Sequence, residues 1–395
     1  MVGVVVFWGW PSETRALELL VADRLSNSVY RYSVTNGTHQ AIISNSPDLN
    51  QPAGIGISPD FREVYVASSQ NNRVMKYDYN PFTGATSNAT IFADAGDGLQ
   101  FPNDIRFSPD GKKIYVANLN GGVSQFNTDG SSAGDKLLLS ANAATSSLNF
   151  TSSGKMLAGA FQTAGGGGVA ISNADVSAFP GYLVTPRGEI TGATGIMVHD
   201  DYVYVSGLFT TSIYRYSLST GEQDPSWLIS GVGFPQGLVE SPDGNGFLAG
   251  ILGFTNGTGS ISRYAYDGTF LSTFATPSGD GFTEATAMVF VPDPPVGDFD
   301  GNGVVNAGDY VTWRKALPTA TLFNDNTPGI VSASDYADWR ANFGKRGPAV
   351  ATGLFVVSAV PEPSSAVLLL VAFFTVDWTS GRPARRSGRA EAQPT

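Results

Sequence analysis

The sequence predicts an all-β fold, a six-bladed β-propeller, for residues 17–293. The prediction rests first on a strand–turn–strand pattern, clearest at residues 103–118, where Ile105 and Phe107 alternate with polar residues. The turn that follows, Ser108-Pro109-Asp110-Gly111, combines residues that favour tight turns. Copies of the pattern return at a spacing of roughly 40–50 residues, which is the length of a four-stranded propeller blade.

The two ends of the repeat region complement each other. Residues 19–23 and 29–33 match the second and third strands of the pattern, but no first strand precedes them. The segment near 286–291 is a first strand with no second strand after it. We therefore expect this last strand to complete the first blade and close the ring.

Composition excludes several functional classes. The formal net charge of −11 argues against nucleic-acid binding, which needs a basic surface. The absence of cysteine excludes thiol catalysis, cysteine-ligated zinc and disulfides. With only two histidines a histidine-rich metal centre is excluded, and His199, in a turn equivalent to Ser-Pro-Asp, is expected to be solvated.

Residues 1–16 contain an apolar run from Val2 to Trp10 that is open to three interpretations. It is either a poor or truncated signal peptide, since no basic residue precedes it and no clear cleavage site follows. Or it reflects a wrongly assigned start, or an extra strand against the first blade.

Residues 294–348 predict a small calcium-binding domain after a proline-rich linker. Oxygen-bearing side chains occupy loop positions one, three, five, nine and twelve, with glycine at six, and a helix is expected at 310–317, ended by Pro318. Calcium needs several hard oxygens on a tightly turned loop. The alternative is a turn that only caps the helix. The predicted ligands are Asp298, Asp300, Asn302, the Val304 carbonyl, Asn306 and Asp309.

The unit returns at residues 324–335, and both copies continue with Asp-Tyr-x-x-Trp-Arg. The pair resembles a type I dockerin module, which implies calcium in both loops and docking to a cohesin-like partner. The second loop departs from the pattern, with asparagine at positions one and three and Pro328 at position five. It is expected to bind calcium weakly or not at all. Its ligands would be Asn324, Asn326, the Ile330 carbonyl and Asp335.

Residues 349–395 form a third region: a Pro-Glu-Pro motif, a short apolar segment at 364–378 and an arginine cluster. The apolar run is about half of the ~20 residues that span a bilayer comfortably. The order resembles the PEP-CTERM sorting signal, which implies an exosortase-type protease, a cytoplasmic arginine tail and a propeller outside the cell. The alternative is a disordered tail whose apolar part packs on the protein. The motif residues are Pro361, Glu362, Pro363, Arg382, Arg385 and Arg386.

The propeller sequence resembles gluconolactonase-like and NHL-type six-bladed propellers. In the lactonase group a divalent metal lies in the central channel on glutamate, asparagine or aspartate side chains. Asn103 matches one ligand position, whereas Ala53, Gln236 and Thr286 stand where other ligands are wanted, and Asp104 and Glu284 are out of register.

Two functions follow as hypotheses. One is an exported, non-catalytic propeller that binds a protein or a glycan. The alternative is a metal-dependent lactonase acting in the channel, with Asn103 as a ligand. The incomplete ligand set favours the first, because fold alone does not establish catalysis.

Overall fold

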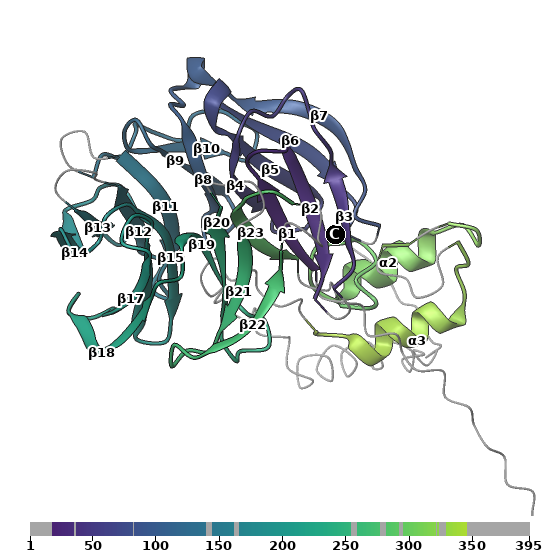
Figure 1. Ribbon diagram of the computed structural model, residues 1–395. Coiled ribbons are helices and arrows are strands. Elements are labelled where there is room, and N and C mark those ends of the chain that lie inside the picture. Colours follow the sequence, from purple (N-terminus) through teal and green to yellow (C-terminus); the bar gives the residue numbers. More distant parts are fainter. Residues whose placement is uncertain are drawn as a thin grey trace, which may run out of the picture. The chain divides into compact units, whose positions relative to one another are not determined.

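Six antiparallel sheets form the blades of a β-propeller between Glu18 and Val291 (Figure 1). The computed structural model describes residues 18–34, 37–81, 83–139, 144–161, 166–253, 259–276, 282–291, 295–320, 322–323 and 329–345. The predicted fold class and blade number are confirmed.

Each blade runs from an innermost strand at the central channel to an outermost strand at the rim. The first blade is β23 (Ala285–Val291), β1 (Glu18–Asp23), β2 (Ser28–Ser33) and β3 (His39–Ile43). The next two are β4 (Pro52–Ile57), β5 (Glu63–Ser68), β6 (Arg73–Tyr79) and β7 (Thr86–Ala93), then β8 (Pro102–Phe107), β9 (Lys113–Asn118) and β10 (Val123–Asn127). The fourth is β11 (Ala144–Phe150), β12 (Met156–Phe161), β13 (Gly167–Ile171) and β14 (Gly181–Arg187). The last two are β15 (Ala193–His199), β16 (Tyr202–Gly207), β17 (Ser212–Ser217) and β18 (Gln223–Ser230), then β19 (Phe234–Glu240), β20 (Phe247–Leu252), β21 (Ser260–Tyr264) and β22 (Phe270–Ala275).

The ring closes where the sequence predicts. Strand β23, from the end of the repeat region, pairs antiparallel with β1 from its start, so that Leu19 faces Phe290 in the ladder. Figure 1 shows the two strands side by side, one purple and one green. Below the ladder, the buried Asp23 carboxylate accepts hydrogen bonds from the backbone N–H groups of Thr283 and Glu284 at 2.7 and 2.9 Å. The closure is therefore held by a ladder and by one buried carboxylate.

The third blade has three strands, whereas the repeat predicts four. Beyond β10, the described residues up to 139 form only isolated bridges, from Val123 to Leu137 and from Phe126 to Ser132. The intervening segment contains Gly130 and Gly134, both at positive φ, and such glycines interrupt a continuous strand.

The core lies between neighbouring blades. Leu20 and Val289 of the first blade pack in one buried cluster with Ile55 and Val66 of the second. Similar clusters join the other neighbours. Each sheet thus buries its two faces against adjacent sheets, which is why the inner strands carry long apolar runs.

In the described residues after the propeller, two helices form: α2 (Ala307–Lys315) and α3 (Ala333–Asn342). The predicted bounds 310–317 were wrong by two to three residues at each end. Helix α2 begins earlier because the Asn306 side chain caps it and Asp309 completes a capping box inside its first turn. It ends at Lys315, before Pro318.

The two helices are joined by reciprocal hydrogen bonds. The Trp313 indole of α2 donates to the Ser332 carbonyl at 3.0 Å, and the Trp339 indole of α3 donates to the Asn306 carbonyl at 2.7 Å. Each tryptophan therefore reaches the residue that caps the other helix, in keeping with the duplication seen in the sequence.

Several predictions lie outside the described residues: the segment 1–16 and the tail 349–395 with its apolar part 364–378. The motif residues Pro361, Glu362, Pro363, Arg382, Arg385 and Arg386 lie there too. Within the described ranges, no helix has the length and apolar character needed to cross a membrane.

Candidate functional site

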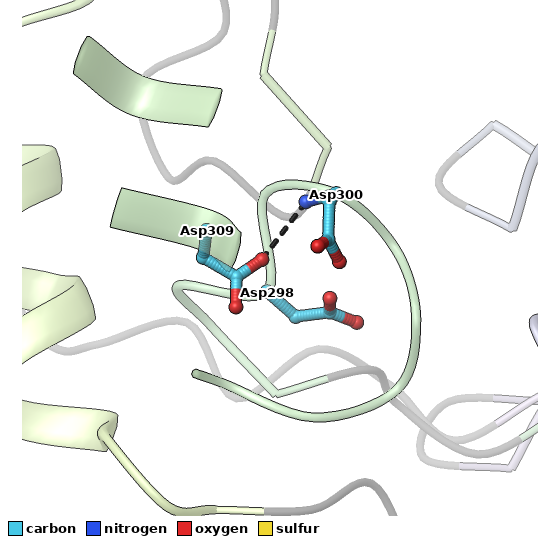
Figure 2. Close-up of side chains that lie close together, drawn as sticks. All are labelled: Asp298, Asp300 and Asp309. Atoms are coloured by element: carbon cyan, nitrogen blue, oxygen red, sulfur yellow. Dashed lines mark hydrogen bonds between the residues drawn. The ribbon is translucent and has the colours of Figure 1, made fainter. Parts of the chain in front are cut away.

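Three carboxylates converge in the loop that leads into α2. The side chains of Asp298, Asp300 and Asp309 each offer an oxygen, and these oxygens all lie within 4.8 Å of one another. Figure 2 shows Asp298 and Asp300 on the loop and Asp309 at the start of the helix. In the described part of the chain, this is the one group of three or more His, Cys, Asp or Glu side chains close enough to share a metal ion.

Backbone N–H groups curl the loop around these carboxylates. The two oxygens of Asp298 accept hydrogen bonds from the N–H groups of Asn302 and Gly303, at 3.0 and 2.9 Å. Asp309 accepts from the N–H of Asp300 at 2.9 Å, the bond dashed in Figure 2, and from that of Asn306 at 2.7 Å. The spacing read from the sequence thus becomes a closed turn with its carboxylates inside.

The carboxylates raise one another's proton affinity. Burial, with the nearby charges of Asp309 and Asp300, raises the pKa of Asp298 to about 6. Burial, with the charge of Asp300, also raises the pKa of Asp309. The side chains of Asp298 and Asp309 are fully buried. A cluster of like charges in such surroundings is unfavourable alone and is stabilised by a bound cation.

The donor chemistry fits a hard divalent cation. The Asn302 amide lies against Asp300, and the Asn306 amide donates to the Val304 carbonyl, so all six predicted ligand residues lie in one turn. Every donor is an oxygen, which Ca²⁺ prefers. One ligand departs from the prediction: the Asn306 side-chain oxygen accepts from Gly308 N–H as a helix cap. Loop position nine often reaches calcium through water, which suits this arrangement.

The second loop is described only in part. Asn324 and Asn326 lie outside the described residues, and the Ile330 side chain is exposed. The buried Asp335 accepts from the Ser332 N–H at 2.6 Å and completes the capping box of α3, as Asp309 does for α2. The structure therefore supports the duplicated helix start without testing the second ligand set.

In the propeller channel, Asn103 serves the contact between blades. Its amide donates to the Ser146 carbonyl of the next blade at 2.6 Å. At equivalent positions, Thr194 donates to the Pro235 carbonyl and Thr286 to the Pro52 carbonyl, both at 2.9 Å. Ala53 and Gln236 occupy two further positions of this ring. Asn103, Thr194 and Thr286 thus each link one inner strand to the inner strand of the next blade.

The two carboxylates that are out of register are both paired. Asp104 is buried, its pKa is raised by desolvation, and Arg106 lies 2.9 Å from it. Glu284 is 1% exposed and pairs with Arg24 at 2.6 Å. Asp104 lines the narrow channel with Asn103. Among the described residues, neither Asp104 nor Glu284 belongs to a group of three His, Cys, Asp or Glu side chains that could share a metal ion.

The channel opens into a cavity of about 290 Å³ on the side where the innermost strands begin. Asn103, Thr194 and Gln236 lie at its base, and Phe161 and Phe209 are among the apolar residues around it. This apolar lining has no local signal in the sequence, because its residues come from strand ends and loops of different blades.

The sequence also did not predict a contact between the ends of two inner strands in adjacent blades. The His199 Nδ1 lies 2.6 Å from Glu240, and its ring stacks on that of Tyr266 at 3.5 Å. The prediction that His199 is solvated was wrong. His199 and Glu240 are the last residues of β15 and β19, so comparing the repeats position by position could have paired them.

The family comparison matches part of the propeller. Residues 20–157 match the family model described as the SMP-30/Gluconolactonase/LRE-like region. That stretch covers most of the first blade without its innermost strand β23, the second blade, the three-stranded blade and the start of the fourth. The comparison with curated proteins found no match.

Solved structures resemble the chain in fold. A chain of the nidogen/laminin complex has 11% identity and a TM-score of 0.55, covering 69% of this chain and 98% of that one. A candidate 6-phosphogluconolactonase from Bacteroides fragilis has 15% identity and a TM-score of 0.49, covering 71% and 100%. A similar candidate from Bacteroides uniformis has 18% identity and a TM-score of 0.46, covering 66% and 82%. At these identities, the likeness to the nidogen/laminin chain supports the propeller fold alone.

Proposed function

We propose that this chain is an exported, cell-surface binding protein. Its propeller binds a protein or glycan, its 298–309 loop binds calcium, and its C-terminal tail is a sorting signal read by exosortase-type machinery. The observation that carries the proposal is the convergence of Asp298, Asp300 and Asp309. Such clusters of oxygen ligands are used for calcium, whose supply outside the cell allows weak sites to fill.

Calcium titration into the full chain tests this part. We expect one site, weakened more than about tenfold by Asp309→Asn, because this change removes the carboxylate that closes the loop. Asp267→Asn is the matched control, since Asp267 lies in an exposed propeller turn. Equal calcium affinity in the chain and in Asp309→Asn would refute the calcium site.

The binding role of the propeller is supported by its channel. The amide of Asn103 and the hydroxyls of Thr194 and Thr286 are engaged with carbonyls of neighbouring blades. With these hydrogen bonds, the three side chains stabilise the propeller as a scaffold for binding. The dockerin-like pair of helices would add docking to a cohesin-like partner, because reciprocal tryptophan bonds hold it as one unit.

Localisation tests the sorting signal. Replacing Arg385 and Arg386 by alanine together should abolish surface display, since a basic cluster fixes the cytoplasmic end of such a tail. The matched control is Lys315→Ala with Arg314→Ala, which removes two basic residues from α2. Unchanged display of the tail variant would contradict the sorting role.

A second candidate function is a metal-dependent lactonase, favoured by the family match over residues 20–157. It requires a metal in the channel near Asn103. The test uses the full chain with Asp309→Asn, which silences the loop. A stoichiometric metal that Asn103→Ala removes, together with lactone hydrolysis, would establish this candidate over the binding role.

A further inference from the structure

The mouth of the propeller channel has an apolar wall. Phe101, Leu119, Phe161, Leu208, Phe209 and Leu252 line its cavity of about 290 Å³. Phe161 and Leu252 end the strands β12 and β20, and the other four lie in loops, so several blades together form the wall. A cavity of this size and character suits a small ligand or one side chain.

Two of these rings face one another across neighbouring blades. The ring centroids of Phe161 and Phe209 lie 6.0 Å apart at an interplanar angle of 61°. Phe209 remains 48% exposed, although it is large and apolar. A third aromatic ring at this edge would bury that surface and add favourable edge-to-face contacts.

The cavity carries no unpaired charge in the described part of its lining. Arg24 is the one charged residue there, and its Nε and Nη2 donate to Glu284 at 2.8 and 2.6 Å. Glu284 is 1% exposed. A carboxylate or phosphate that captured Arg24 would leave Glu284 buried without its counter-ion, which is strongly unfavourable. The mouth therefore disfavours anions.

Gln236 supplies a polar group at the base of the cavity. It is 9% exposed and lines both the cavity and the narrower channel below it. Asn103 and Thr194 donate to a neighbouring blade, whereas the Gln236 carboxamide has no hydrogen-bond partner among the described residues. An amide offers two donors and one acceptor, and a ligand that covered them without forming hydrogen bonds would be disfavoured. A ligand with an amide or hydroxyl would satisfy them.

We propose that the channel mouth binds an uncharged aromatic group with an adjacent amide or hydroxyl. The ring packs against the exposed surface of Phe209 at the edge of the Phe161–Phe209 pair, and the polar group bonds to the Gln236 carboxamide. This names the ligand class for the propeller and rests on the proposal that the propeller is a binding module. An aromatic residue within a peptide and a free aromatic amide share this chemistry.

Titration of the full chain with three matched probes tests the chemistry. N-acetyl-phenylalaninamide has the ring and is neutral, N-acetyl-phenylalanine replaces the amide by a carboxylate, and N-acetylglycinamide lacks the ring. We expect the neutral aromatic probe to bind at least about tenfold more tightly than either of the others. Equal or tighter binding of the carboxylate probe, or no binding of any probe, would overturn the proposal.

Variants assign the binding to this cavity. Phe209→Ala and Gln236→Met should each weaken the neutral aromatic probe several-fold, and Phe270→Ala, at a 54% exposed phenylalanine of β22, should leave it unchanged. Glu284→Gln frees Arg24, so it should shift preference toward the carboxylate probe. Thermal unfolding of each variant checks that it folds. Unaltered binding in both Phe209→Ala and Gln236→Met would place the probe elsewhere.

A capped pentapeptide with phenylalanine between two glycines on each side distinguishes the two sources. Tighter binding than N-acetyl-phenylalaninamide indicates a peptide that continues outside the mouth, and weaker binding indicates a free small molecule. Both outcomes support the ligand chemistry. Calcium titration reports on the 298–309 loop alone. A failure of the aromatic probes to bind would therefore be distinguishable from a failure of the loop to bind calcium.

Discussion

Aspartate side chains in this chain differ in acidity because of what surrounds them. The hydrogen bond from Ser226 and the ion pair with Arg215 lower the pKa of Asp224 to about 2. Burial and like charges raise that of Asp298 to about 6. The first carboxylate is satisfied by its neighbours, and the second belongs to a cluster that a cation would stabilise.

The raised pKa of Asp298 predicts how calcium affinity depends on pH. A proton competes with calcium for this carboxylate, so affinity at pH 5 should be about tenfold weaker than at pH 7, as measured by calorimetric titration. A pH-independent affinity over this range would contradict the assignment of Asp298 as a ligand.

Without calcium, stability should depend on pH in the direction opposite to that of an ordinary aspartate, whose pKa is lowered by folding. The folded pKa is raised above the unfolded one, so between about pH 4 and 6 the folded state binds more protons. The calcium-free loop should therefore lose stability as pH rises through this window, and calcium should restore it above pH 6.

Among individual residues, the sequence could predict the local cluster of carboxylates but not long-range partners. Asp298 and Asp309 lie eleven positions apart on one loop, so spacing alone identifies them. The Glu240 partner of His199 lies on another blade, and the unpartnered amide of Gln236 depends on the packing of the whole channel. Such contacts are set by the ring and not by any local pattern.

At the scale of elements, the blade turns depend on a left-handed residue. Ser108 donates to Asp110 at 2.6 Å, and Gly111 follows at φ +71°. The equivalent residue of the second blade is Phe61, which takes φ +59° while its ring is buried in the core. Packing thus offsets the conformational cost at Phe61, whereas Gly111 avoids it.

Gly111→Ala should lower the free energy of unfolding by more than about 1 kcal/mol, because a Cβ here adds both φ strain and a clash. The added Cβ would lie 2.8 Å from Pro59 Cγ. Gly154→Ala is the matched control, since Gly154 has φ +81° and open space around it. Urea unfolding measures both, and a larger loss at Gly154 would contradict this reading of the turn.

The reciprocal tryptophan bonds predict that the helices support calcium binding unequally. Trp339→Phe removes the donor to the Asn306 carbonyl at the first loop, and should weaken calcium about fivefold, or about 1 kcal/mol. Trp313→Phe removes the bond to Ser332, away from that loop, and should change calcium affinity less than about twofold. Equal effects in the two titrations would argue against this coupling.

The bounds of the strands and helices show which elements local sequence patterns can predict. Most strands follow from alternation and turn residues, because both are short-range. The start of α2 was placed too late because Asn306 serves two roles, as a loop residue and as the helix cap. The missing fourth strand of the third blade reflects glycines whose effect on pairing depends on the neighbouring strand.

For the whole molecule, the defining feature is the closure of a ring by its two ends. The unpaired strand patterns at both ends of the repeat region predicted this closure, and β23 pairs with β1 accordingly. The buried Asp23, which holds the backbone of Thr283 and Glu284 beside the ladder, had no signal in the repeat.

Asp23→Ala should destabilise the whole propeller by about 3 kcal/mol, because it leaves several buried donors unpaired at the closure. A single cooperative loss in urea unfolding is expected, since the ring couples all blades. Asp129→Ala, at an exposed turn, is the control and should change stability little. A loss confined to local fraying, or no loss, would show that the ladder alone closes the ring.

The central claim is that the 298–309 loop binds calcium, and a crystal structure of the full chain grown with calcium tests it most directly. Our account predicts anomalous density for one ion about 2.3–2.6 Å from oxygens of Asp298, Asp300 and Asp309. A calcium-saturated crystal with no ion at these carboxylates would contradict it.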